Sequence, residues 1–210
     1  MGFSGFSEKD FATFKIDSLE GRMKAIQECI QPKFQSIGEE LVDYLSTQLG
    51  NEMFVHIAKH ARRTVNPPND TWTAFSYNHR GYKMTPHFQI GLWDDRVFVW
   101  LAYIYELPHK QSIAQLFIDH IKKLQDMIPG DYNISTDHMK KSDKKLMDID
   151  FNQTLHRFRD VKKAELLIGK QFSSDDPLLK DGSAFFQAVK SIYDDLIPIY
   201  QLSLKYNSKE

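Results

Sequence analysis

Apolar residues recur along the chain with two different periods. Near the two ends of the chain they stand three or four positions apart, which is the spacing of one face of a helix. From Met53 to Tyr105 the period falls towards two, which is typical of strands. The pattern therefore predicts helices at both ends of the chain and a sheet between them.

The helical segments have recognisable boundaries. Ser7 followed by Asp10 is typical of a helix start, and Gly50 is typical of a helix end. Pro32 is expected to interrupt the second helix, and Pro198 to bend the last one. We predict helices at about 8–15, 18–30, 34–49, 111–128, 151–158 and 183–204.

Strands are predicted at about 53–58, 71–77, 82–92, 96–105, 131–136 and 164–172, with hairpin turns at 78–81 and 94–95. The fourth strand is apolar on both faces and should be central. The lysine-bearing segment 138–148 is expected to be a solvated loop. The fold class is α+β: a single domain, 1–210, with an antiparallel sheet meander and N-terminal, middle and C-terminal helices packed mainly on one side.

Composition and charge narrow the choice of protein class. The net charge of −1 and a pI near 6.7 argue against a protein that coats nucleic acid through bulk charge. A single cysteine, Cys29, excludes an internal disulfide. We find no signal peptide and no apolar run as long as a membrane span, so a cytoplasmic protein without a membrane anchor is expected.

One stretch is distinctly basic. Residues 56–87 hold five Lys or Arg against one carboxylate, Asp70, and four of the eight histidines. Arginine forks suit phosphate, and Trp72 would stack on a ring. We therefore predict a cytoplasmic binding domain for a phosphate-bearing ligand, either a nucleotide or a short nucleic-acid segment. The predicted ligand-binding residues are Lys59, His60, Arg62, Arg63, Trp72, Arg80, Lys83, His87 and Gln89.

Several alternatives stay open. The arginines would instead serve structure if they pair with acidic residues and pin the turn 66–69. The chain would be a hydrolase or transferase if His87 or His60 acts as an acid/base beside the arginines. It would be an interaction module if the basic loop docks on an acidic partner. The sequence leaves open whether the protein is an enzyme.

No cofactor or metal is expected. His56 and His60 lie in a strand-like pattern, so they would be ~13 Å apart and too distant for one ion. The sequence also lacks a Walker phosphate loop, Gly-x-Ser-x-Gly and Gly-x-Gly-x-x-Gly.

The chain resembles a known family in the same region. The residues that carry this resemblance are 53–72, 80–83, 86–93 and 161–167. Together they resemble the YktB-like family of small bacterial proteins, and the likeness extends over nearly the whole chain. It implies one α+β domain of uncharacterised biochemical function.

Overall fold

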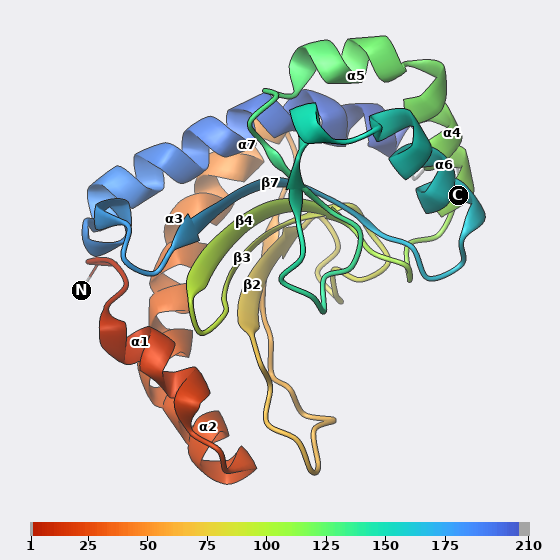
Figure 1. Cartoon of the computed structure of the whole chain (residues 1–210). Helices are drawn as coiled ribbons and strands as arrows, with labels where there is room; N and C mark the ends of the chain where they lie inside the picture. The colour runs from red at the N-terminus through yellow and green to blue at the C-terminus, as the bar shows by residue number, and fades with distance from the viewer. Residues whose placement is uncertain (1, 206–210) are drawn as a thin grey trace.

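A curved seven-stranded antiparallel sheet forms the centre of the molecule in the computed structural model, which describes residues 2–205 (Figure 1). The strand order is β1-β2-β3-β4-β7-β5-β6, so the first four strands form the predicted meander. The strands are β1 (Phe54–Ile57), β2 (Thr71–Ser76), β3 (His87–Leu92), β4 (Arg96–Tyr103), β5 (Asn133–Ser135), β6 (Lys144–Lys145) and β7 (Leu166–Ser173). The α+β class is confirmed.

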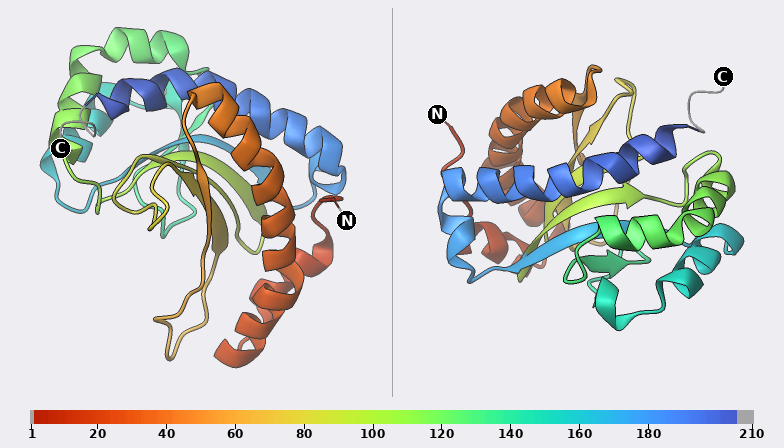
Figure 2. Two further views of the ribbon diagram at one scale, coloured as in Figure 1. Left: turned by 180° about the vertical axis from the view of Figure 1, so that it is seen from behind. Right: turned by 90° about the horizontal axis from the view of Figure 1, so that it is seen from above.

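The helices gather on the convex side of the sheet, as predicted (Figures 1 and 2). The long helices α3 and α7 run across that side, and α4, α5 and α6 cover its far end. The helices are α1 (Glu8–Ala12), α2 (Leu19–Ala25), α3 (Gln31–Leu49), α4 (Lys110–Asp119), α5 (Ile121–Met127), α6 (Phe151–Asp160) and α7 (Gly182–Leu204). The concave side of the sheet has no helix against it in these views.

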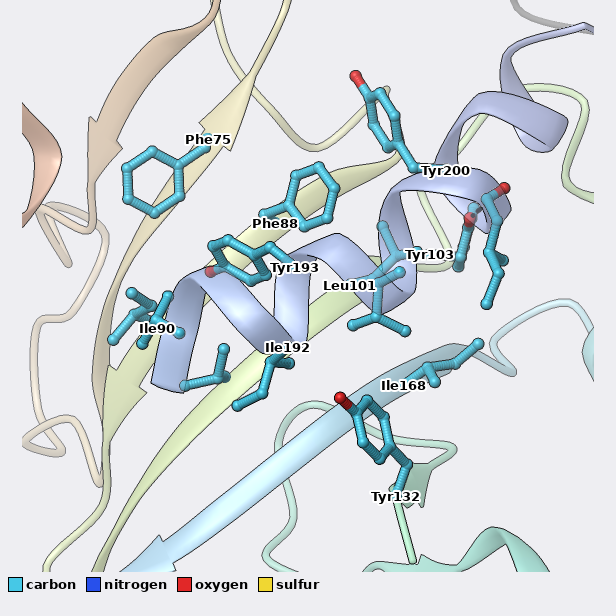
Figure 3. Close-up of a cluster of buried hydrophobic side chains, with 14 of the residues drawn as sticks. Phe75, Phe88, Ile90, Leu101, Tyr103, Tyr132, Ile168, Ile192, Tyr193 and Tyr200 are labelled. Carbon is cyan, nitrogen blue, oxygen red and sulfur yellow. Dashed lines mark hydrogen bonds between the residues drawn. The ribbon is translucent and has the colours of Figure 1, made fainter. Parts of the chain in front are cut away.

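The main core lies between the convex face and α7 (Figure 3). Phe88 of β3 packs against Tyr193 and Tyr200 of α7, with ring centroids 4.7 and 5.0 Å apart. Tyr193 also donates a 3.0 Å hydrogen bond to the main-chain oxygen of Gln89. Aromatic packing and a satisfied hydroxyl thus fix α7 on the sheet.

The strand β4 is central, as its apolar pattern predicts. It pairs with β3 on one side and β7 on the other. Successive side chains point to opposite faces of a strand. Leu101 and Tyr103 therefore enter the main core, whereas Phe98 and Trp100 lie on the concave face.

Several predicted elements differ from the structure. Pro32 does not interrupt its helix, because it stands in the first turn of α3, directly after a π-helical turn at Ile26–Ile30. A missing proline N–H is tolerated at such a position. The helix expected at 111–128 breaks at His120, whose backbone leaves helical geometry.

The third strand begins only after Pro86, because the preceding segment forms turns instead of extending to 82. Within the expected loop 138–148, Lys144–Lys145 form β6 and pair with β5. The expected helical bend at Pro198 falls inside α7, which continues through it to Leu204.

Candidate functional site

Aromatic side chains line the concave face of the sheet. Trp72, Phe98 and Trp100 project there from β2 and β4, and Trp93 joins them from the turn between β3 and β4. The rings of Phe98 and Trp100 stack, with centroids 6.3 Å apart and planes at 23°. All three tryptophans of the chain therefore lie on this face.

A glycine makes room for this aromatic surface. Gly91 pairs with Trp72 on one side and Phe98 on the other. A Cβ at Gly91 would lie 2.2 Å from the Phe98 ring, so no larger residue fits unless the ring moves. A close ring approach is a recurrent reason for glycine within a strand.

These rings enclose a narrow cleft, which we call the aromatic cleft. Its walls are Trp72, Trp93, Phe98 and Trp100, and its polar lining includes Asp70, Gln89, His138 and Lys140. The loop 136–143 reaches across it from the end of β5, and the rings of His138 and Trp72 are 6.4 Å apart. The free space is about 10 Å³, which is room for about one water molecule.

Asp70 is the buried acid of the cleft. It directly precedes β2, and only 2% of its surface is exposed. Within residues 2–205, no other side chain makes a hydrogen bond to its carboxyl group. Burial raises the pKa of Asp70 to about 6, although the charges of His138 and Arg63 act in the opposite direction. The carboxyl group is thus desolvated and without a strong donor, which is unfavourable for the folded protein alone.

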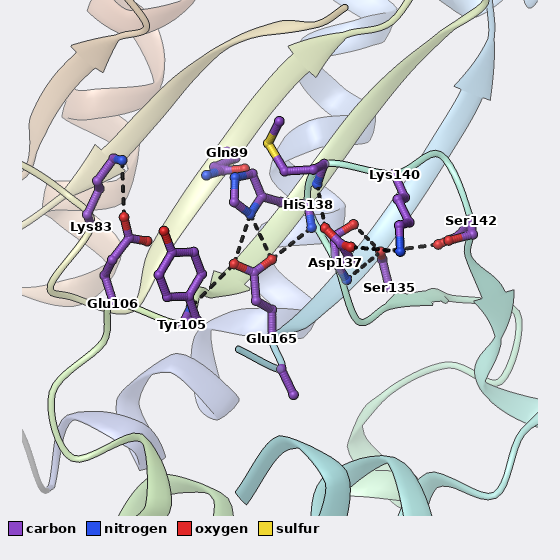
Figure 4. A network of polar contacts seen from close by, with 12 residues as sticks. Lys83, Gln89, Tyr105, Glu106, Ser135, Asp137, His138, Lys140, Ser142 and Glu165 are labelled. Carbon is purple, nitrogen blue, oxygen red and sulfur yellow. Dashed lines mark hydrogen bonds and ion pairs between the residues drawn. The ribbon is translucent and has the colours of Figure 1, made fainter. Parts of the chain in front are cut away.

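His138 and Glu165 form a hydrogen-bonded pair (Figure 4), and the charge of His138 acts on Asp70. The Nδ1 atom of His138 lies 2.7 Å from the Glu165 carboxylate, which also accepts the backbone N–H of His138 at 2.8 Å and that of Tyr105 at 3.3 Å. Glu165 is 2% exposed, so its partners hold it firmly. The second ring nitrogen, Nε2, lies on the side of Gln89, away from Glu165 (Figure 4).

The charge of His138 follows from these neighbours. Burial lowers the pKa of His138, but the hydrogen bond and charge of Glu165 outweigh it, and Asp70 and Glu106 act in the same direction. The net shift raises the pKa above the ordinary value of 6.5. The cleft therefore favours the protonated form of His138, close to an aspartate that is mostly ionised at neutral pH.

His87 lies beneath the cleft rather than in it. It is fully buried, and both ring nitrogens are engaged: Nδ1–H donates to the Thr85 carbonyl at 2.8 Å, and Nε2 accepts from Gln89 at 2.8 Å. We infer this tautomer because the carbonyl can only accept. Burial lowers the pKa of His87 to about 4. Both ring nitrogens of His87 are thus occupied within the fold, and a role for His87 in binding or catalysis stays a prediction.

His60 is also held within the structure. Its Nε2 lies 3.1 Å from the Thr71 hydroxyl, and its backbone has a positive φ of 49°. Burial, together with the charge of Arg63, lowers the pKa of His60 to about 4. A role for His60 in binding or catalysis stays a prediction.

The predicted cations do not gather in the aromatic cleft. Lys59, Arg62 and Arg80 are exposed, and Lys83 pairs with Glu106 at 3.2 Å. Arg63 is half-buried, and its charge acts on both Asp70 and His60. Of the nine residues predicted to bind a ligand, Trp72 and Gln89 line the cleft. The binding roles of the others stay predictions.

The loop between β1 and β2 is pinned by a different arginine from those expected. Arg22 of α2 donates to the Pro68 carbonyl at 2.9 Å and to the Ile16 carbonyl at 2.8 Å. Buried guanidinium bonds of this kind fix the loop from outside the basic stretch. Arg62 and Arg63 make no side-chain ion pair within residues 2–205, so the predicted structural pairing is not seen there.

Comparisons with known proteins assign the chain to a protein family. Residues 6–200 match the family described as "Domain of unknown function (DUF1054)". The chain belongs to this family. It is 54% identical to a UPF0637 protein of Shouchella clausii, with 97% of each chain covered. It is 53% identical to one of Oceanobacillus iheyensis, with 96% of this chain and 97% of the relative covered, and 49% identical to one of Listeria monocytogenes, with 98% and 100% covered.

The family assignment confirms the expectation of an uncharacterised bacterial family, and its description names no activity. No helix among residues 2–205 has the length and apolarity needed to cross a membrane.

Most residues of the cleft were not among the predicted site residues. Phe98 and Trp100 belong to the strand that was predicted to be central, and His138 and Lys140 to a segment that was expected to be a solvated loop. The available signal was that β4 is apolar on both faces while the helices cover mainly one, so the second aromatic face needed another partner. The position of His138 had no comparable signal, because a loop residue is placed by tertiary contacts.

Three potential metal-ligand atoms also lie near one another, from Asp137, His138 and Glu165, within 4.8 Å. His138 and Glu165 are already bonded to each other, and Lys140 pairs with Asp137 at 3.2 Å. These contacts account for the three groups, so we assign no metal to them.

Proposed function

We propose that this protein binds a small flat nitrogen heterocycle of the nucleobase class in the aromatic cleft. The observation that carries the proposal is the Asp70 carboxyl group, which is buried among tryptophan rings and lacks a side-chain donor in the described chain. A ring with N–H donors would supply the missing hydrogen bonds. Bonds of this kind to a charged group contribute about 1.5–3 kcal/mol.

The walls of the cleft support a flat ligand. Indole rings offer large rigid faces, and stacking of a base on an aromatic side chain contributes about 1–3 kcal/mol. Trp72 is fixed by a 2.9 Å bond from its Nε1–H to the Tyr82 hydroxyl, and Phe98 and Trp100 hold each other by stacking. Such preorganised rings lose little freedom when a ligand binds.

Basic side chains near the cleft support a phosphate on the ligand. Lys140 lines the cleft, and Arg63 is close enough to Asp70 for their charges to interact. Lys59 and Arg62 precede Arg63 on the same exposed loop. A nucleotide, as predicted from the sequence, is therefore still the proposed ligand. Its ring would bind in the cleft, and its phosphate would bind the basic side chains at the edge of the cleft, which we call the rim.

Binding requires the cleft to open. A space of about 10 Å³ holds a water molecule, not a heterocycle. The exposed residues Met139, Lys140 and Ser142 of the loop 136–143 are the natural moving part, because Lys140 lines the cleft while His138 is held by Glu165.

Tryptophan fluorescence tests the proposal directly, since all three tryptophans line the cleft. Purified protein is titrated with free bases, nucleosides and nucleoside 5′-monophosphates. We expect saturable quenching. Asp70→Asn should weaken binding by about 10- to 100-fold, while Asp126→Asn on the exposed face of α5 should leave it unchanged. Fluorescence that no ring changes, or equal losses in both variants, would refute the proposal.

The contribution of the phosphate to binding can be measured separately from that of the ring, by comparing a nucleoside with its monophosphate. If Lys140 and Arg63 contact a phosphate, the advantage of a monophosphate over its nucleoside should fall as salt is raised. Lys140→Ala and Arg63→Ala should remove that advantage and leave binding of the nucleoside unchanged. An advantage that is insensitive to salt and to both substitutions would contradict the rim assignment.

A further inference from the structure

We infer that the aromatic cleft is a hydrolytic active site that cleaves the N-glycosidic bond of a nucleoside or nucleotide. Asp70 activates a water molecule, and His138, positioned by Glu165, protonates the departing ring nitrogen. This inference rests on the proposed function, because the heterocycle that the cleft binds is the leaving group of the reaction.

The geometry of His138 and Glu165 is that of an oriented acid–base group. A carboxylate on one imidazole nitrogen fixes the tautomer and direction of the ring, and the other nitrogen is then presented to a substrate. Here Nδ1 is held by Glu165 at 2.7 Å, and Nε2 has no partner within residues 2–205 and lies toward Gln89 in the cleft lining (Figure 4). Glu165 is a positioning residue, since His138 lies between it and the cleft.

The charges around the two groups set their roles. His138 is surrounded by Glu165, Asp70, Glu106 and Asp137, with neutral His87 below it, and Asp70 is near His138, Arg63 and the Tyr82 hydroxyl. The acids favour the protonated form of His138, whereas Asp70, with a pKa of about 6, is mostly ionised at neutral pH. The protonated imidazole is therefore the general acid, and the carboxylate is the general base.

The proposed step balances in atoms and charge. Asp70 takes one proton from water as the water oxygen bonds to the sugar carbon. The bond from that carbon to the ring nitrogen breaks, and its electron pair goes to the nitrogen. His138 gives its Nε2 proton to that nitrogen, so the products are a free sugar hydroxyl and a free base. Water is the only co-reactant.

The residues around the cleft favour cleavage of an N-glycosidic bond over cleavage of an ester or amide bond. Acyl transfer requires paired donors aimed at an oxyanion. Gln89 already donates an N–H to His87, and Gln171 accepts from Arg96 through its carbonyl oxygen, so neither amide is held as one of a pair of donors aimed at a common point. Glycosidic cleavage instead develops positive charge on the sugar. Carboxylates and tryptophan faces stabilise that charge.

Neither the serine beside the cleft nor the single cysteine is placed to act as a covalent nucleophile. The Ser135 hydroxyl is donated to carbonyls of its own loop, at 3.2 Å to Asp137 and 3.2 Å to Ser142. Cys29 lies in the π-helical turn between α2 and α3 and does not line the cleft. Direct hydrolysis is therefore the simplest route.

The test measures free base released from the common nucleosides and their 5′-monophosphates by chromatography. We expect release by the full-length protein, with a bell-shaped pH profile: activity rises as Asp70 ionises near pH 6 and falls above the raised pKa of His138. His138→Gln and Asp70→Asn should each lower kcat at least 100-fold. Asp126→Asn should match the natural protein.

Glu165→Gln provides the diagnostic readout. It should lower kcat and move the upper limb of the pH profile to lower pH, because the carboxylate charge no longer raises the pKa of His138. A residue that only supports the fold would lower activity without moving that limb. Unfolding curves of each variant verify that the protein remains folded.

The outcomes separate this inference from the proposed binding. His138→Gln should still quench with free base while releasing none. Quenching by bases together with no release from any nucleoside or nucleotide would overturn the hydrolysis and retain binding. Release that survives His138→Gln, or that a chelator abolishes, would also overturn it.

Discussion

At the scale of single residues, the buried carboxylate of Asp70 serves the proposed site but lowers the stability of the folded protein. Its pKa is raised from 3.8 to about 6 in the folded protein, so between these values the folded state binds more protons than the unfolded state. Stability gained from this group is therefore present below pH 3.8 and is lost as pH rises to about 6. Above pH 6 the ionised carboxylate destabilises the fold by about 2–3 kcal/mol.

Replacing that carboxylate should stabilise the protein. We predict that Asp70→Asn raises the free energy of unfolding by about 2 kcal/mol at pH 8 and by much less at pH 4, measured by urea denaturation. Stabilisation on removal of a polar residue is typical of a site kept for function. Asp126→Asn is the control. Destabilisation by Asp70→Asn at both pH values would show that the carboxylate supports the fold.

Two histidines show why residue roles were hard to predict. His87 alternates with the core residues of its strand, and the sequence predicts a ligand-binding or acid/base role for it. That face is covered at this point, since the Tyr82 ring lies 4.9 Å from His87. His138 sits in a lysine-rich loop with no periodicity, and only the fold brings it to Glu165, 27 residues later in the chain.

At the scale of elements, β7 depends on a glycine at the centre of the sheet. Gly169 pairs with Trp100 of β4 and Asn133 of β5. A Cβ there would lie 2.0 Å from the Val99 carbonyl oxygen and 3.0 Å from the Trp100 ring. The carbonyl belongs to the backbone of a central strand and has little room to retreat.

We predict that Gly169→Ala destabilises the protein by about 1–3 kcal/mol and changes the tryptophan emission, because the sheet and the Trp100 ring must shift. Gly81→Ala is the matched control, since a Cβ at Gly81 meets no atom within 4 Å. Denaturation curves and emission spectra of both variants test this. Equal stabilities for the two would contradict the packing argument.

Elements with strong periodicity were predicted well, and irregular ones were not. The meander, the turn at Asp94 and the central place of β4 follow from alternation and turn residues, which are local properties. The π-helical turn before Pro32 and the break at His120 have no periodic signal in the sequence. The two-residue strand β6 is too short to leave any period in the sequence.

At the scale of the whole molecule, the two faces of the sheet have different partners but share the same strands. In β3, Phe88 enters the core under α7, while the adjacent Gln89 lines the cleft. In β4, Tyr103 and Trp100 divide in the same way. The strands β3 and β4 carry side chains of both faces. Loss of these strands would therefore disorder the helical layer and the cleft together.

We therefore predict that residues 1–210 unfold as one cooperative domain. Far-UV circular dichroism reports the helices of the convex side, and tryptophan fluorescence reports the cleft. The two probes should give superimposable urea transitions, and calorimetry should give equal calorimetric and van't Hoff enthalpies. Gly169→Ala should move both transitions to lower urea together, since it acts on the strands that they share. A fluorescence transition that precedes the loss of helix would show that the cleft side unfolds separately and would refute the single-domain prediction.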